Sequence, residues 1–140
     1  MKVNIKKISP DATLPSYAHE SDAGVDLFSS KTIILSKGER AQVPTGISME
    51  IPEKYVGLIW DKSGLSHKVG LKTMGGVIDA GYRGEVMVGV INLGDESYTI
   101  EKGHKVAQML FQKVKHAELE EVTELSETPR GDGGFGSMGK

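Results

Sequence analysis

The sequence contains no cysteine and no long hydrophobic run. The absence of cysteine excludes disulfides and thiolate metal sites and fits a reducing compartment. No apolar stretch approaches the roughly 20 residues that a membrane-spanning helix needs. Residues 1–10 also lack the apolar region of a secretory signal. We therefore expect a cytoplasmic protein that has no membrane partner.

An excess of basic charge is also lacking. The 17 basic and 19 acidic residues leave a net charge of −2, whereas domains that bind a nucleic-acid duplex usually carry a basic surface. Nucleic acid is therefore not expected as a partner, but a small anion held by a few cations is not excluded. The length of 140 residues suits one domain. The 18 glycines indicate tight turns or a close approach of backbone to a ligand.

Short strand patterns dominate the first 115 residues. Apolar side chains alternate in 45–51 and 105–114, whereas 55–60 and 85–93 are apolar on both faces. Residues 35–39 and 93–97 have the composition of hairpin connections. Turn signals recur every 8–12 residues or so, which is typical of an all-β sandwich or barrel.

Three other segments lack a clear strand pattern. Residues 63–68 predict one short helix, with Ser63 as its N-cap. The acidic segment 116–127 fits a helix or a strand, and an extended strand is favoured. Residues 128–140 are rich in glycine and cannot hold a fixed structure alone. We expect a β-barrel over 1–127 followed by a flexible flap over 128–140.

Two segments, one where a strand is expected to begin and one where a strand is expected to end, carry charge beside glycine. Asp22 and Asp26 flank Gly24, which fits a functional carboxylate as well as a simple turn. Lys62 and Ser63 follow an apolar strand where a helix is expected to begin. The free N–H groups of a helix start, together with a cation, suit a phosphate. Taken alone, the second segment is explained more simply by an ordinary N-cap with a surface ion pair.

The segment 75–85 leads from apolar Val77 and Ile78 directly into Asp79. A carboxylate at the end of a buried strand is a candidate general base. The neighbouring glycines let the backbone approach a flat ligand closely. The structural alternative is a tight hairpin turn in which Asp79 bonds to its own backbone.

The last two segments place polar groups in unusual surroundings. Gln108 shares an apolar face with Val106 and Leu110, so its amide must find a partner in the protein or a ligand. Arg130 and Phe135 stand among glycines, which fits a flap that offers a cation and a ring. A disordered tail is the alternative. The four histidines lack the spacing of a metal site.

In this order and spacing, the five segments resemble the motifs of the trimeric dUTP pyrophosphatase (dUTPase) family. The resemblance runs from Asp22 to Gly139, and GVIDAGYRGE and RGDGGFGS are its most specific parts. It implies a jelly-roll-like β fold and a homotrimer with active sites shared between subunits. The implied reaction hydrolyses dUTP to dUMP and pyrophosphate, which keeps uracil out of DNA and supplies dUMP for thymidylate synthesis.

The resemblance also implies a role for each matching residue. Asp79 would activate a water for in-line attack on the α-phosphorus, and Tyr82 would exclude a ribose 2′-hydroxyl. Asp26 would support the catalytic water and the metal shell. Mg²⁺ would be held by substrate phosphates and water without a direct protein ligand. The base and sugar contacts would be Thr73, Gly76, Val77, Ile78, Tyr82 and Phe135, and the phosphate contacts would be Lys62, Ser63, Gly64, Gln108, Arg130, Gly136 and Ser137.

The chain departs from the family pattern at three places. Arginine is usual at Lys62, and lysine keeps the charge but loses the planar fork. Asparagine is usual at Thr73, which offers only a hydroxyl. Ala80-Gly81 replaces a pairing with a second acid. Two rivals are a dCTP deaminase, which needs a carboxylate where Gly89 stands, and a binding module without catalysis, which gives no reason for Asp79 and the flap.

Overall fold

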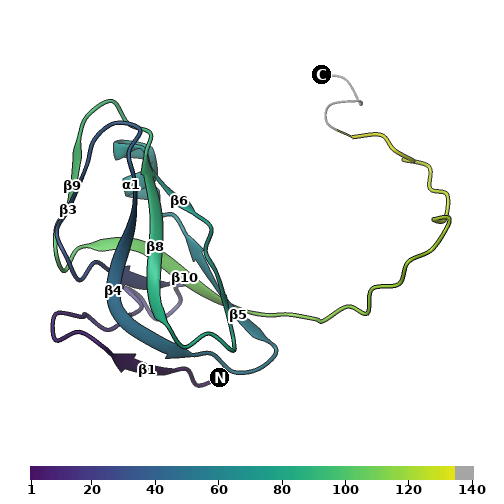
Figure 1. Ribbon diagram of the computed structural model, residues 1–140, viewed down its shortest axis with the longest axis horizontal. Helices are drawn as coiled ribbons and strands as arrows, with labels where there is room; N and C mark the ends of the chain where they lie inside the picture. The colour runs from purple at the N-terminus through teal and green to yellow at the C-terminus, as the bar shows by residue number, and fades with distance from the viewer. Residues whose placement is uncertain (135–140) are drawn as a thin grey trace.

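The computed structural model describes residues 1–134, which form short antiparallel strands and the helix α1 (Figure 1). This confirms the predicted all-β fold class. The elements are β1 (Asn4–Lys7), β2 (Val25–Phe28), β3 (Ile33–Leu35), β4 (Arg40–Glu50), β5 (Tyr55–Trp60), α1 (Ser63–Val69), β6 (Leu71–Met74), β7 (Val77–Asp79), β8 (Glu85–Asn92), β9 (Tyr98–Ile100) and β10 (Lys105–Lys113).

Two four-stranded sheets enclose the core. Their strand orders are β1-β4-β8-β6 and β2-β10-β5-β7, and β3 pairs with β9 in a small third sheet. Apolar side chains from both large sheets pack into one buried cluster. Its fully buried members include Leu27, Ile47, Val86, Val88, Val90 and Met109. This arrangement is the expected jelly-roll-like barrel.

The strand patterns read from the sequence are largely confirmed. Ile47, Met49 and Ile51 are buried, whereas Glu50 is exposed. The strand predicted over 45–51 is longer in the structure, since β4 begins at Arg40. Its register is irregular between Pro44 and Ser48, where Gly46 has a φ of +70°. A side chain at Gly46 would be strained in this left-handed conformation.

The two predicted hairpin connections are wrong. Residues 35–39 join β3 to β4 and residues 93–97 join β8 to β9, and each pair lies in different sheets. Both connections turn a corner together around the fully buried Asn92. Its Nδ2 donates to the carbonyls of Leu35 and Glu96, and its Oδ1 accepts the N–H of Gly94. Turn composition predicts a reversal of direction but does not specify which strand pairs with which.

The helix α1 is fixed at its end by glycine. Gly70 adopts a left-handed conformation (φ +83°) and donates its N–H to the helix carbonyl of Ser66. A Cβ at Gly70 would lie 2.5 Å from the backbone nitrogen of Gly94. The helix can therefore pack closely on the connection that follows β8.

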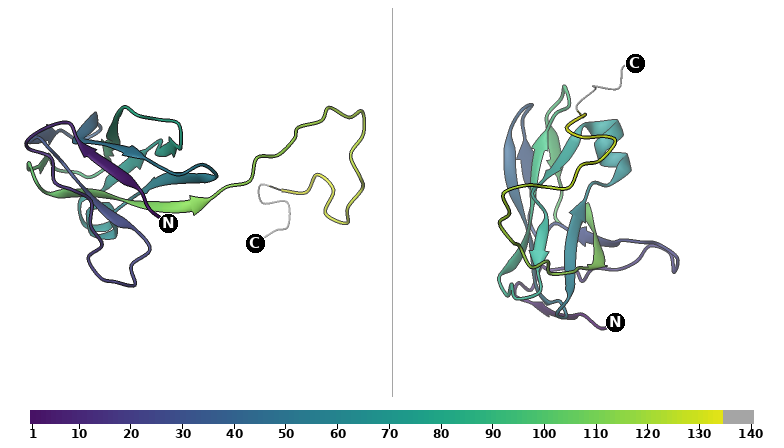
Figure 2. Two further views of the ribbon diagram at one scale, coloured as in Figure 1. Left: turned by 90° about the horizontal axis from the view of Figure 1, so that it is seen from below. Right: turned by 90° about the vertical axis from the view of Figure 1, so that its right-hand side faces the viewer.

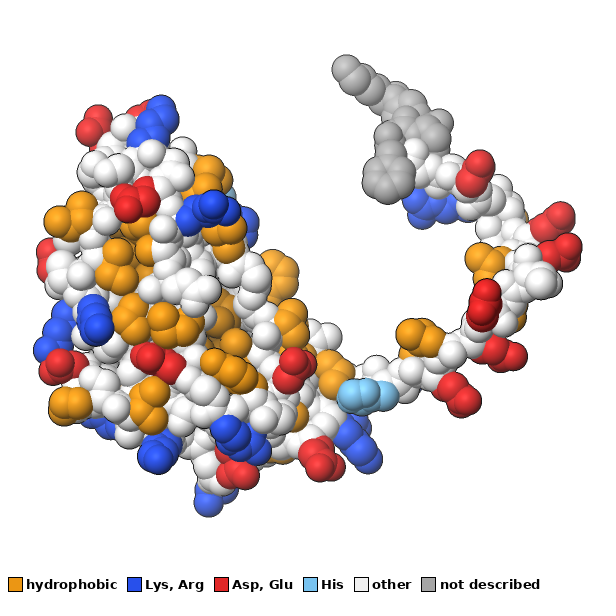
Figure 3. Space-filling view, viewed as in Figure 1, with side chains coloured by type: hydrophobic (Ala, Val, Ile, Leu, Met, Phe, Trp, Pro, Cys, Tyr) orange, Lys and Arg blue, Asp and Glu red, His pale blue; other side chains and the backbone are white. Residues whose placement is uncertain are grey.

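The chain leaves the barrel after β10 as an extended arm (Figures 1 and 2). Val114 donates its N–H to Lys54, but 116–127 form no strand, so the predicted extended strand is wrong. Acidic and hydrophobic side chains are mixed along the arm (Figure 3), and Leu119 and Leu125 are 92% and 87% exposed. A strand needs a pairing partner, and one chain offers none here. No helix of the described residues is long and apolar enough to cross a membrane.

Candidate active site

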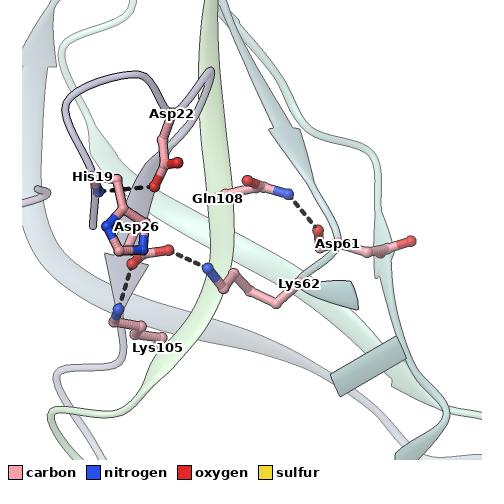
Figure 4. Close-up of polar contacts among 7 residues, drawn as sticks. All are labelled: His19, Asp22, Asp26, Asp61, Lys62, Lys105 and Gln108. Atoms are coloured by element: carbon pink, nitrogen blue, oxygen red, sulfur yellow. Dashed lines mark hydrogen bonds and ion pairs between the residues drawn. The ribbon is translucent and has the colours of Figure 1, made fainter. Parts of the chain in front are cut away.

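A buried carboxylate with two lysines forms the centre of one cluster (Figure 4). Asp26 lies in β2, and its side chain is 3% exposed. Its Oδ1 lies 2.5 Å from Nζ of Lys62, and its Oδ2 lies 2.6 Å from Nζ of Lys105. Burial raises the pKa of Asp26, but the hydrogen bonds and positive charges of Lys105 and Lys62 outweigh it and hold the pKa below its ordinary value. The carboxylate therefore stays ionised and holds two cations at one place.

Gln108 lies beside this cluster. It is paired with Asp26 on one neighbouring strand and with Trp60 on the other. Its Nε2 donates to the backbone carbonyl of Asp61 at 2.9 Å, which confirms that the amide must have a partner. A Cβ at Gly24 would lie 2.9 Å from Oε1 of Gln108, so the glycine leaves room for the amide.

The start of α1 completes this end of the barrel. Ser63 was expected to be the N-cap, but Lys62 occupies that position and Ser63 is the first helical residue. No side chain caps the helix start, because Lys62 cannot accept a hydrogen bond and its ammonium reaches Asp26 instead. Gly64 is exposed, and a Cβ there would meet nothing within 4 Å. The first N–H groups of the helix thus lie next to Lys62 on an open surface.

A second group of predicted residues lies along β6, β7 and the turn between them. A hollow of about 220 Å³ opens there, lined by Leu58, Ile59, Trp60, Lys72, Thr73, Gly75, Gly76 and Val77. The carbonyl of Gly76 accepts the N–H of Ile59 at 2.8 Å, and a Cβ at Gly76 would lie 2.9 Å from the carbonyl oxygen of Ile59. Ile78 packs against the core, whereas Val77 is 65% exposed. The strand β7 is therefore an exposed edge strand, and the expectation of a buried strand before Asp79 is wrong for one chain.

The turn after Asp79 is held by its own residues. The N–H of Tyr82 donates to the carbonyl of Asp79 at 3.1 Å, and the Tyr82 hydroxyl donates to the carbonyl of Glu85 at 2.9 Å. The guanidinium of Arg83 donates to the carbonyls of Ala80 and Tyr82. Asp79 itself is exposed and open to solvent.

Asp79 lies far from the Asp26 cluster in one chain. Asp79 is paired with Val56 at one end of β5, whereas Gln108 is paired with Trp60 at the other end. Val56 and Trp60 are four positions apart along the strand, which corresponds to about 13 Å. A general base must lie within hydrogen-bond reach of the group it serves. One chain therefore does not unite Asp79 with Lys62 and Gln108.

The described part of the last motif lies on the arm that follows β10. Arg130 is on the exposed arm, where its Nε donates to the carbonyl of Gly133 at 2.8 Å. Phe135, Gly136 and Ser137 lie outside the described residues. Within residues 1–134, no group of three or more histidine or acidic side chains is arranged to hold a metal ion.

Two residues of the first cluster were missed by the sequence analysis. Lys105 holds the second oxygen of Asp26. Asp61 accepts hydrogen bonds from Lys72, from the backbone N–H of Thr73 and from the Thr73 hydroxyl. These bonds and the nearby charge outweigh the effect of burial and lower the pKa of Asp61. The sequence signal for Asp61 was its position directly before Lys62 at the end of a predicted strand.

Comparison with known proteins places the chain among dUTPases. The dUTPase family model matches residues 10–139. A deoxyuridine 5′-triphosphate nucleotidohydrolase of Clostridium tetani is 47% identical, over 99% of this chain and 97% of the relative. The corresponding protein of Mycolicibacterium gilvum is 49% identical, over 96% of this chain and 93% of the relative.

Solved structures give the same result. The dUTPase of Staphylococcus bacteriophage 80alpha with dUpNHpp has a TM-score of 0.93 and 34% identity, over 99% of both chains. A mutant dUTPase from phage phi11 of S. aureus, whose structure concerns the coordination of a structural Mg(II) ion, has a TM-score of 0.83 and 31% identity. That match covers 89% of this chain and 98% of the phage chain.

Proposed function

The chain belongs to the dUTPase family and hydrolyses dUTP to dUMP and pyrophosphate, and we propose that each active site combines residues of different subunits in a homotrimer. The separation of Asp79 from Gln108 along β5 carries this proposal. Base and phosphate contacts must surround one substrate, so strands β6 and β7 of one subunit face the Asp26 cluster of a second. A trimer related by a closed three-fold axis forms three such sites.

Asp79 acts as the general base in this proposal. Its exposed carboxylate, at the end of β7, takes a proton from the water that attacks the α-phosphorus. Pyrophosphate then leaves from the opposite side. Phosphoryl chemistry of this kind needs positioning and charge neutralisation more than covalent participation by the protein. A single well-placed base is therefore sufficient.

The Asp26 cluster supplies the positive charge. Lys62 and Lys105 contribute +2 and Asp26 contributes −1, so the cluster carries a net +1. The triphosphate is further held by the open helix start at Ser63 and Gly64 and by the amide of Gln108. Both carboxylate oxygens of Asp26 face lysines. Asp26 would thus support the catalytic water and metal shell mainly by holding these cations.

Base and sugar are recognised along β6 and β7. The hydroxyl of Thr73 donates its hydrogen bond to Asp61 and not to a ligand. The backbone from Thr73 to Ile78 therefore carries most of the recognition of uracil. Gly76 leaves the backbone accessible to a flat ring beside the hollow. The ring of Tyr82 packs against the deoxyribose, where a 2′-hydroxyl would clash.

Mg²⁺ and the flap complete the site. The cluster of lysines and N–H groups suits an anion rather than a bare cation, so Mg²⁺ would bind through the phosphates and water and neutralise their charge. Residues 128–140 form a flap, in which Arg130, Gly136 and Ser137 contact the terminal phosphates and Phe135 stacks on uracil. A third subunit is the proposed donor of this flap. Cytoplasmic location and the lack of a nucleic-acid partner stay predictions from composition.

The structure does not favour a carboxylate at the position where a deaminase needs one. Gly89 lies in β8 opposite Met74, and a Cβ at Gly89 would lie 2.9 Å from the backbone carbonyl oxygen of Met74. Any side chain at this position would therefore require the backbone at Met74 to shift. The observation favours hydrolysis of dUTP over deamination of dCTP.

The substitution Asp79→Asn tests the assigned base. The amide has the same shape but cannot take the proton, so kcat for pyrophosphate release from dUTP should fall by about 10³-fold or more. Binding of dUpNHpp should persist. The control Asp95→Asn removes a carboxylate that is 90% exposed and paired with Lys37 on a remote turn. A kcat near that of the unaltered protein would rule out Asp79 as the base.

A further inference from the structure

The side chain of Asp61 joins two segments that belong to different parts of the substrate site. Its Oδ1 accepts the N–H and the hydroxyl of Thr73, each at 2.7 Å, and its Oδ2 lies 2.8 Å from Nζ of Lys72. Its backbone carbonyl accepts the amide of Gln108 (Figure 4). Lys62 follows directly in the chain. Asp61 therefore contacts β6, which carries proposed contacts to the uracil base. It also directly precedes the proposed phosphate contacts Lys62–Gly64.

The bonds from Asp61 to Lys72 and Thr73 connect the two large sheets. The strand β5, which ends just before Asp61, belongs to the sheet of β10 and β7, whereas β6 pairs with β8 in the other sheet. Sheet hydrogen bonds therefore do not set the position of Thr73 relative to Lys62. Two donors of Thr73 on one charged oxygen fix both its backbone and its rotamer. The hollow between Trp60 and Thr73 opens at this junction.

We infer that Asp61 is a positioning residue that sets β6 and the segment Lys62–Gly64 relative to each other. The inference rests on the proposed site residues, and it adds a consequence for the trimer. If the two segments serve different sites, each Asp61 supports the base contacts of one site and the phosphate contacts of its neighbour. Loss of Asp61 would then weaken the binding of both parts of the substrate.

A purely stabilising ion pair is the alternative. Lys72 is 50% exposed, and exposed pairs of this kind contribute little to stability. The side chain of Asp61 is only 22% exposed, however, and two of its bonds go to Thr73 rather than to a charged group. The two interpretations differ in whether ligand affinity changes while the protein stays folded.

The experiment uses the full chain and two fragments of the substrate. Deoxyuridine probes the base contacts and inorganic pyrophosphate probes the phosphate contacts, with binding followed by calorimetry and by the fluorescence of Trp60, the single tryptophan. In Asp61→Asn, the affinity for each fragment should fall about threefold or more, since charge-assisted bonds are lost. The matched control is Asp11→Asn, which removes the exposed partner of Lys102. Thermal melting of each variant shows whether it is folded at the temperature of titration.

Variants of Thr73 keep the test decisive if Asp61→Asn folds poorly. Thr73→Ser retains the hydroxyl that donates to Asp61, whereas Thr73→Val loses it, so the serine variant should bind deoxyuridine more tightly than the valine variant. Thr73→Val should have a smaller effect in the Asp61→Asn background than alone, because both changes weaken the same bond. Unchanged affinity of folded Asp61→Asn for either fragment, or equal behaviour of the serine and valine variants, would overturn the inference. Hydrolysis of dUTP by the unaltered chain is measured separately, so its absence would count against the proposed function and not against the role of Asp61.

Discussion

The ammonium of Lys105 lies 2.6 Å from Oδ2 of Asp26, the oxygen that Lys62 does not contact. Asp26 is buried beneath the two lysines, so each of its oxygens depends on one cation for compensation. An ionised oxygen that is buried without a partner is costly. This relationship makes Lys105 important for folding as well as for the charge of the site.

Lys105→Met should destabilise the protein. Methionine keeps most of the volume but leaves Oδ2 of Asp26 unpaired, which costs about 1–2 kcal/mol after allowance for water that reaches the half-exposed lysine. The measurement is urea unfolding at one fixed protein concentration. The control Lys102→Met breaks an exposed pair with Asp11 and should change the unfolding free energy by less than about 0.5 kcal/mol. Equal effects of the two substitutions would contradict the importance of the buried oxygen.

The same carboxylate should make stability depend on acidity. Burial raises the pKa of Asp26, but Lys105 and Lys62 lower it by more than burial raises it. The pKa in the folded state therefore lies below the ordinary 3.8. The unfolded state therefore takes up a proton first as the pH falls. The stabilisation is complete well above pH 3.8 and is lost as the pH falls through the folded pKa.

Asp26→Asn removes this contribution and provides the test. The difference in unfolding free energy between the unaltered protein and the variant should be constant near neutral pH and should shrink below about pH 4. Urea unfolding at a series of pH values measures it. The contribution of Asp61 is present in both proteins and cancels. A difference that stays constant throughout the acid range would show that Asp26 is not the responsible group.

The sequence was most informative where a local pattern decides the structure. The alternation at Ile47, Met49 and Ile51 predicted the buried face of β4, and the isolated amide of Gln108 predicted a hydrogen-bond partner. Segment order and spacing identified the family. Each of these inferences needs only residues that are close in sequence.

The remaining features depend on contacts between distant segments. Asp61 reaches Thr73 only because β5 and β6 end side by side in different sheets. The partnership of Asp26 with Lys105 likewise depends on the pairing of β2 with β10. Turn composition could not show that Asn92 holds a corner between sheets. The exposure of β7 was missed because its apolar sequence indicates burial without showing whether the cover is the same chain or another.

Gly84→Ala should relax the selection of the sugar. A Cβ at Gly84 would lie 2.4 Å from the hydroxyl oxygen of Tyr82, so the phenol must leave the carbonyl of Glu85. The tyrosine can move without disturbing the backbone, so the fold should survive. We expect the ratio of kcat/KM for UTP to that for dUTP to rise about tenfold, since one positioned ring contact is lost. Pyrophosphate release from the two nucleotides measures this ratio.

The control for this prediction lies in the same turn. A Cβ at Gly81 would meet nothing within 4 Å, so Gly81→Ala tests the effect of an added methyl group without displacing Tyr82. It should leave the preference for dUTP unchanged. If both alanine variants discriminate as the unaltered protein does, the position of Tyr82 does not determine the choice of sugar.

Mixing two inactive variants tests whether the sites are shared. Asp79→Asn removes the general base, and Gln108→Ala removes a phosphate contact, at opposite ends of β5. After joint unfolding and refolding of equal amounts, a shared site is intact when it draws Asp79 and Gln108 from different undamaged chains. Random assembly gives this combination in about one quarter of the sites of a symmetric trimer, so about a quarter of the original activity should return. If both groups came from one chain, every site would carry one of the two lesions, and the mixture would stay as inactive as its components.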